Sequence, residues 1–293
     1  MVPFHLPAAS SIGHAHLQIS NLEQGLHFYR DLIGLRETGQ AGKAVALSAA
    51  GNSPPLILLA ARTNAKPKPP HTTGLFHVAI RFPNRRELAR IFRRLVDQGW
   101  PFQGFADHGV SEALYLADAD DNGVELYADR PGQQWHWRNG EVFMSTAPLD
   151  VDGLLREIEQ DPVPPCQIHP KTDIGHIHLQ VSDLQRAEAF YHGVLGLQVT
   201  QRSYPGALFL SAGGYHHHLG LNTWAGQGAL PPPPEAVGLL AFSIQVPNQH
   251  TLGTLADRVQ SAKMPLQDHS AAISRPAFTT RDPDGNAIVI EAE

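Results

Sequence analysis

The sequence predicts an α+β protein built from four βαβββ modules, which pair to form two open eight-stranded barrels. The segment IGHAHLQISNL at 12–22 returns as IGHIHLQVSDL at 174–184, an offset of 162 residues. A second pair, RFPN at 81–84 and QVPN at 245–248, follows an offset of 164. Each copy starts with a short apolar segment typical of a strand and continues with apolar residues at helical spacing. These observations indicate one unit repeated four times.

The repeats divide the chain as follows. Modules one to four cover residues 10–61, 74–130, 174–224 and 237–292. The predicted domains are 10–130, with modules one and two, a linker at 131–172, and 173–293, with modules three and four. A single module has a half-open sheet and cannot cover its own inner face, so modules must pair.

The elements of a module follow in a fixed order. The first strand is followed by an amphipathic helix, with Leu22, Leu26 and Tyr29 at helical spacing in module one. We expect this helix and its three counterparts to begin at polar N-cap residues. These are Asn21, Asn84, Asp183 and Asn248. Short strands such as VALSAAG and LFLSAGG complete the unit, and the linker contains a short helix at DVDGLLREIEQ.

Composition limits the function classes. The net charge of −6 comes without a basic cluster, so a nucleic acid is not an expected partner. No apolar run reaches the length of a membrane span, and the N-terminus does not resemble a signal peptide. The single cysteine, Cys166, fits a reducing cytoplasm. We expect a cytoplasmic protein and an assembly of identical chains, the number of which stays open.

The repeats also serve as an internal control, because scaffold positions agree between copies while some polar positions do not. Module two has four polar residues that module four replaces at the same offset. The pairs are His77 and Ala241, His108 and Ala272, Tyr115 and Thr279, and Glu125 and Val289. Packing alone would not require these polar groups in one copy only.

Modules one and three differ in a similar way. Both copies keep a histidine in the first strand, His14 and His176. Module three alone has the run His216–His218, which falls on Ser53, Pro54 and Pro55 of module one. Strand alternation predicts that at least one of these three histidines faces solvent. The polar chemistry therefore concentrates in modules two and three.

Three of these residues have the character of a metal site. His77 and His176 lie in the first strands of their modules, and Glu125 lies in the last strand of module two. Alternation puts Glu125 and Tyr115 on the face opposite to Leu114 and Leu126. Two imidazoles and one carboxylate can bind one side of an ion, a ligand set that suits non-haem Fe(II), with Mn(II) as the alternative.

The segment DHGVSEALYLADADDNGVELY, at 107–127, resembles the ring-cleavage signature of type I extradiol dioxygenases. These enzymes belong to the vicinal oxygen chelate superfamily, with glyoxalases and the fosfomycin and bleomycin resistance proteins. The βαβββ repeat extends this resemblance over nearly the whole chain. Ala119 and Asp121 depart from the signature, but at a turn rather than at the polar groups.

The resemblance implies a catechol 2,3-dioxygenase type of enzyme, whose partners are a small aromatic diol and O2. It makes His217 the acid–base residue, with His218 as the near alternative. It makes His108 and Tyr115 hydrogen-bonding partners of the substrate. In well-known extradiol enzymes the last two modules hold the metal, whereas here module four lacks the ligands.

Two pairings of modules remain open at this point. A barrel of modules two and three, with one and four as the second barrel, places the HHH run beside His77 and Glu125 and is favoured. A barrel of modules one and two would use His14 as third ligand in place of His176. His16 and His178 are predicted to be structural, because both copies keep them.

Two other functions remain. A glyoxalase-type isomerase would need a second carboxylate from the partner module, but the matching residues are Gly220 in module three and Ile57 in module one. A metal-free binding or resistance protein would use only the cavity.

Overall fold

The computed structural model describes residues 4–51, 54–161, 166–268 and 276–293. Two positions from the module comparison, Ser53 and Ala272, lie outside these ranges. The predicted α+β class is confirmed: the described chain forms two mixed sheets of eight strands each, and neither sheet closes into a complete barrel.

The first sheet joins modules four and one, so the predicted 1/4 pairing is confirmed. In spatial order its strands are β16 (Leu266–Asp268), β17 (Ala277–Arg281), β18 (Ala287–Ala292), β15 (Gly238–Val246), β1 (Ser11–Ile19), β4 (Ile57–Ala61), β3 (Ala44–Ser48) and β2 (Arg36–Ala41).

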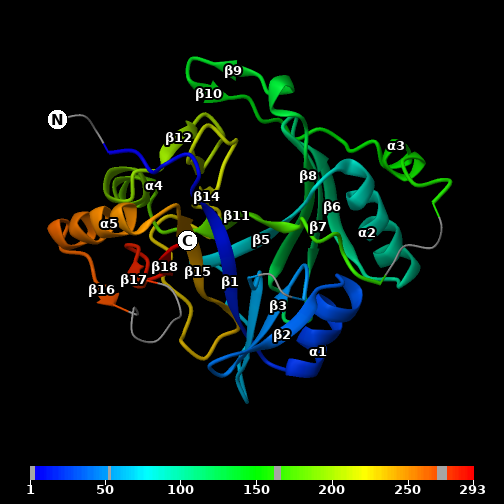
Figure 1. Ribbon diagram of the computed structural model, residues 1–293, viewed down its shortest axis with the longest axis horizontal. Helices are drawn as coiled ribbons and strands as arrows, with labels where there is room; N and C mark the ends of the chain where they lie inside the picture. Colours follow the sequence, from blue (N-terminus) through cyan, green and yellow to red (C-terminus); the bar gives the residue numbers. More distant parts are fainter. Residues whose placement is uncertain (1–3, 52–53, 162–165, 269–275) are drawn as a thin grey trace.

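The second sheet joins modules three and two, as the favoured pairing predicts. Its strands are, in order, β12 (Gln198–Gln201), β13 (Ala207–Ser211), β14 (Leu219–Asn222), β11 (Asp173–Gln180), β5 (Gly74–Phe82), β8 (Gly123–Asp129), β7 (Ser111–Ala117) and β6 (Phe102–Asp107). The two modules meet where β11 pairs antiparallel with β5. In each module the last strand runs parallel to the first. Figure 1 shows β5 and β11 running through the middle of the molecule.

The predicted helices lie on the outer faces of the sheets. Modules two and four have regular helices, α2 (Arg85–Asp97) and α5 (Gln249–Ser261). Modules one and three have short helices, α1 (Leu22–Leu26) and α4 (Leu184–Glu188), which continue as π-helical segments at His27–Leu32 and Ala189–Val194. All four predicted N-caps are confirmed, because each side chain accepts a hydrogen bond from a backbone N–H in the first turn.

The linker between modules two and three lies beside the second sheet. A single 3₁₀ turn (Gly132–Gln134) precedes a hairpin of β9 (Trp137–Arg138) and β10 (Glu141–Val142). The predicted linker helix is α3 (Val151–Arg156). No helix in the described part of the chain is long and apolar enough to cross a membrane.

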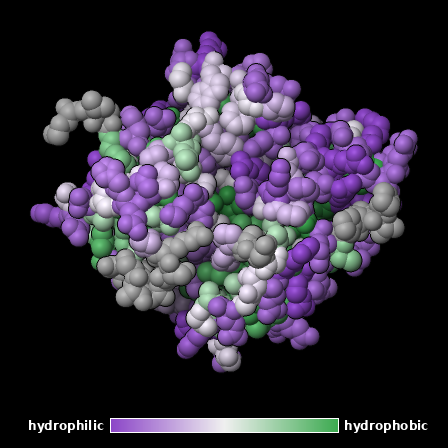
Figure 2. Space-filling view, in the orientation of Figure 1, coloured by the Kyte–Doolittle hydropathy of each residue, from purple (hydrophilic) through white to green (hydrophobic). Residues whose placement is uncertain are grey.

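The face shown in Figure 2 is largely hydrophilic, and hydrophobic residues gather mainly in its middle. Below the surface, one large apolar cluster runs through both sheets and the helices that cover them. Within it lie Leu114 and Leu126, whose side chains point away from those of Tyr115 and Glu125, as strand alternation predicts.

Two buried tyrosine–aspartate hydrogen bonds connect the sheets. The Tyr29 hydroxyl, from module one, donates to Asp118 in the β7–β8 turn of module two at 3.1 Å. The Tyr191 hydroxyl, from module three, donates to Asp282 in the β17–β18 turn of module four at 2.9 Å. Burial raises the pKa of Asp118, although hydrogen bonds from the Asn122 side chain and from backbone N–H groups of the same turn oppose that shift. The sequence repeats FY at 28–29 and 190–191, and D-x-D-x-N at 118–122 and 282–286. These repeated motifs therefore make the contacts between the sheets.

We predict that Asp118→Ala lowers the free energy of unfolding by about 2–4 kcal/mol, because the Asn122 amide and the Tyr29 hydroxyl lose a buried acceptor. Urea denaturation followed by circular dichroism measures the loss. The control is Asp120→Ala in the same turn, whose carboxylate binds Ser20 near the surface and whose loss should cost less than about 1 kcal/mol. Equal losses in the two variants would contradict this role for Asp118.

Candidate metal centre and active-site cavity

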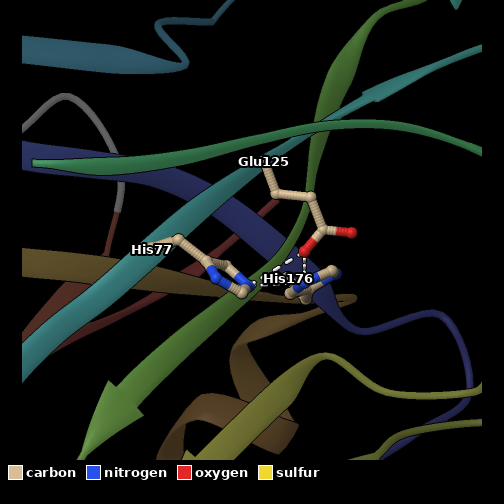
Figure 3. A group of neighbouring side chains, drawn as sticks. All are labelled: His77, Glu125 and His176. Atoms are coloured by element: carbon tan, nitrogen blue, oxygen red, sulfur yellow. Dashed lines mark hydrogen bonds and ion pairs between the residues drawn. The ribbon is translucent and has the colours of Figure 1, made fainter. Parts of the chain in front are cut away.

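Three predicted ligands meet on the inner face of the second sheet. His77 lies on β5, Glu125 on β8 and His176 on β11 (Figure 3). In the sheet register Ala79 of β5 pairs with Glu125 on one side and with His176 on the other. Because Ala79 has a small side chain, the carboxylate and the imidazole from its two neighbours can approach each other above it. His77 lies two residues before Ala79, on the same face of β5.

The three ligand atoms are close together and buried. Glu125 Oε2 lies 2.9 Å from His77 Nε2 and 3.1 Å from His176 Nε2, and the two Nε2 atoms are 3.3 Å apart. The exposed fractions are 6% for His77, 3% for Glu125 and 2% for His176. In the described chain this is the group of three such residues whose geometry could hold a metal ion.

The spacing fits a shared ion. Ligand atoms that lie about 2.1 Å from one ion, at right angles to each other, are about 3 Å apart, which matches all three observed distances. Two imidazole nitrogens 3.3 Å apart repel each other through their lone pairs unless a proton or a cation lies between them. The donor set, two imidazoles and one carboxylate, is that of a facial non-haem metal site.

Electrostatics favour the ligand forms of these side chains. Burial raises the pKa of Glu125, but the adjacent His176 and His77 imidazoles reverse this and hold its pKa well below the usual range. Burial lowers the pKa of His176 to about 4, although Glu125 opposes that shift. A carboxylate and a neutral imidazole are the forms that bind metals.

A cavity of about 370 Å³ lies over the three ligands. Its wall is mainly apolar. Besides the ligands it is lined by Phe76, Gln103, Gly104, Ala106, His108, Val110, Ser111, Tyr115, Leu116, Gly123, Val124, Met144, Ser145, Thr146, His178, Tyr204, Phe209, His217 and Trp224. Phe76 and Trp224 are 37% and 46% exposed and pack edge to face, so they form part of its rim.

Two predicted substrate partners, His108 and Tyr115, lie together on the Glu125 side of the cavity. The Ser145 carbonyl lies 2.6 Å from His108 Nδ1, and the Tyr115 hydroxyl lies 2.7 Å from His108 Nε2. Since a carbonyl only accepts, His108 Nδ1 donates to it, and Nε2 accepts from Tyr115. Burial and then Glu125 raise the pKa of Tyr115 well above its usual value, so the phenol keeps its proton. The Ser145 segment, from the linker, was not anticipated from the sequence.

The three consecutive histidines have three different surroundings. His217 lines the cavity, and its ring lies 4.1 Å from that of His176 between centroids. His216 is fully buried and contacts Asp129 and His217. His218 Nδ1 accepts from Ala212 N–H, and His218 does not line this cavity. Of the three, only His218 is partly exposed to solvent, and the other two are buried.

The alternative third ligand, His14, lies in the other sheet. His14 Nδ1 lies 2.9 Å from the Ser243 hydroxyl and 3.7 Å from Glu291 Oε1, on the sheet of modules one and four. The counterparts of His77 and Glu125 in that sheet are Ala241 and Val289, which offer no ligand. The structure therefore brings His176, and not His14, to His77 and Glu125.

His178, which the sequence predicts to be structural, is buried beside the metal ligands. It lines the cavity, and its ring centroid lies 4.9 Å from that of His77. Its Nε2 lies 3.0 Å from the Asn222 amide nitrogen, which donates to it. The spacing of two residues from His176 already placed both side chains on one face of a strand. Its structural role stays a prediction, and its position adds an imidazole to the cavity wall.

Comparison with known proteins agrees with this architecture. The family model of the glyoxalase/bleomycin resistance protein/dioxygenase superfamily matches residues 11–126 and 173–290. The chain belongs to this superfamily, as the sequence resemblance predicted.

One sequence relative and two solved structures are similar to most of this chain. The chain is 41% identical over 282 residues, 95% of both sequences, to a catechol-2,3-dioxygenase of Bacillus subtilis (strain 168). Among solved structures it is similar to a candidate dioxygenase of Bacillus subtilis subsp. subtilis str. 168 (TM-score 0.67, 11% identity, 99% of this chain and 86% of that one). It is also similar to glyoxalase I of Zea mays (TM-score 0.59, 14% identity, 97% and 92%). At these identities the two structures support the fold alone.

We predict that the protein purified without chelator binds one equivalent of a divalent ion. His176→Ala should weaken metal binding by more than about 100-fold, because loss of a ligand costs more than loss of a residue that only hydrogen-bonds to a ligand. Elemental analysis and competitive titration with Mn(II) measure stoichiometry and affinity. His14→Ala, the repeat counterpart in the other sheet, is the matched control and should bind as the wild type does. Equal weakening in both variants would place the ion elsewhere.

Proposed function

We propose that the protein is a non-haem Fe(II)-dependent extradiol dioxygenase, which cleaves the ring of a catechol-type aromatic diol beside its two hydroxyl groups with O2. The observation that carries the proposal is the buried group of His77, Glu125 and His176 at the floor of an apolar cavity. The name of the 41% identical relative supports the same activity. Mn(II) is the alternative ion, and a cytoplasmic location and a homo-oligomeric state remain predictions.

The side chains around the ligands suit this reaction. When bound, Fe(II) supplies Lewis acidity and electron transfer with O2, which the protein side chains lack. His217 lies on the His176 side of the cavity, where an imidazole can accept a proton from a substrate hydroxyl. Tyr115 and His108 lie on the Glu125 side and are hydrogen-bonded to each other, and the Tyr115 hydroxyl oxygen can still accept a hydrogen bond from a substrate hydroxyl. The apolar wall holds the aromatic ring and excludes water.

A glyoxalase-type isomerase is less well supported, because the metal-ligand group in the described chain contains one carboxylate. The position that would supply a second is Gly220 on β14. A Cβ added there would lie 2.9 Å from the His178 ring, so the present packing leaves no room for a longer side chain. A metal-free binding protein is the remaining alternative, and the metal analysis above separates it from both enzymes.

The activity is tested with protein loaded anaerobically with Fe(II) and then mixed with air-saturated catechols of increasing size. We expect equal consumption of diol and O2 and a yellow semialdehyde product, followed by absorbance and an oxygen electrode. Apo-protein and His176→Ala protein serve as controls and should be inactive. If fully loaded wild-type protein turns over no member of a broad catechol and hydroquinone panel, the proposal is wrong.

Within this activity, His217→Ala should lower kcat by about 10²- to 10⁴-fold, the usual contribution of a general acid or base. Steady-state kinetics at saturating diol and O2 measure kcat. The control is His218→Ala, since His218 is adjacent in sequence but bonds to the Ala212 backbone outside the cavity, and its kcat should stay within about 3-fold of wild type. The reverse order of effects would assign the acid–base role to His218.

A further inference from the structure

A chain of hydrogen bonds leads from His217 away from the cavity. His217 Nδ1 lies 2.7 Å from His216 Nδ1, and His216 Nε2 lies 2.9 Å from Asp129 Oδ1. His216 is fully buried, and Asp129 ends strand β8, the strand that carries Glu125. The chain therefore joins the HHH run of module three to the ligand-bearing strand of module two.

The partners of Asp129 determine which atoms carry protons. A carboxylate only accepts hydrogen bonds, so His216 Nε2 must donate to Asp129. The same carboxylate also accepts from the Tyr215 hydroxyl at 3.1 Å and lies 3.3 Å from Arg81 Nη1. In a neutral imidazole only one ring nitrogen carries a proton, so a proton on His216 Nε2 leaves Nδ1 with its lone pair.

The hydrogen bond between His216 and His217 fixes the position of the next proton. Two Nδ1 atoms 2.7 Å apart form a hydrogen bond only if one of them is protonated. With the lone pair on His216 Nδ1, the proton lies on His217 Nδ1. The other ring nitrogen of His217, Nε2, then carries a lone pair and is the one left to face the cavity that His217 lines.

We propose that Asp129 and His216 are positioning residues, which hold His217 in the tautomer that presents an unprotonated Nε2 to the substrate. This inference rests on the proposed function for its kinetic consequence but not for the tautomer itself. The arrangement follows the rule by which an aspartate orients the catalytic histidine of hydrolases, extended here by one further imidazole. Neither Asp129 nor His216 touches the substrate cavity in the described structure.

The first test observes the tautomers directly. Full-length protein labelled with ¹⁵N-histidine and loaded with diamagnetic Zn(II) is studied by long-range ¹H–¹⁵N NMR, with assignment from the His216→Gln and His217→Gln variants. We expect protonated Nε2 in His216 and protonated Nδ1 in His217, and loss of this pattern in Asp129→Asn. A wild-type His217 protonated at Nε2 overturns the proposal, whatever the enzyme's activity.

The second test is kinetic. Asp129→Asn should lower kcat by about 10- to 100-fold, with KM and bound metal unchanged, as expected for a residue that orients a catalytic group. In the His217→Ala background the same substitution should have no further effect, because the group it orients is gone. An equal loss in both backgrounds would show that Asp129 acts through stability rather than through His217.

The chain offers a matched control in Asp173, a second carboxylate that pairs with Arg81, at 2.7 Å. Asp173→Asn removes a comparable ion pair but leaves the His216 contact intact, so kcat should stay within about 2-fold of wild type and the tautomer pattern should not change. If Asp173→Asn lowers kcat as much as Asp129→Asn does, the effect comes from Arg81 and the proposal is wrong. Inactive wild-type protein with the expected tautomers would instead refute the proposed function alone.

Discussion

The pairing of β5 with β11 is the constraint on which the rest of the site depends. Each module leaves one edge and one face of its sheet uncovered, and this antiparallel pairing joins modules two and three into one surface. It places Ala79 between Glu125 and His176, so that ligands about 50 residues apart in the chain share one row of the sheet. A shift of one residue in this register would turn His176 to the opposite face of the sheet.

The two sheets share a scaffold but have different interiors. Tyr29 with Asp118, and Tyr191 with Asp282, make the same buried contact between sheets in both halves of the chain. These contacts do not depend on what each inner face carries, so both copies keep them. The inner face of modules one and four has instead Ala241 and Val289 at ligand positions, while His14 pairs with Ser243. Module two and module three thus combine the scaffold with the polar groups.

The HHH run shows how local geometry limits a pattern argument. Alternation describes a regular strand, but residues 216–218 lie before β14 begins at Leu219, so their side chains are free to point in unrelated directions. His217 faces the cavity, His216 bonds to Asp129, and His218 bonds to the Ala212 backbone. All three are at least half-buried, because each finds a polar partner or a stacking ring within the protein.

Much of this protein was determined by the sequence itself. The internal offsets identify the modules, their N-caps and the concentration of polar groups in modules two and three, because repeated local patterns need no knowledge of the distant chain. The tertiary structure alone decided between His176 and His14 as the partner of Glu125, since that choice depends on which sheet edges pair. It also decided the cavity position of His178, the Ser145 contact with His108, and the chain from Asp129 to His217. The Ser145–His108 and Asp129–His216 contacts join residues 37 and 87 positions apart, whose approach is set by sheet register and burial rather than by spacing in the sequence.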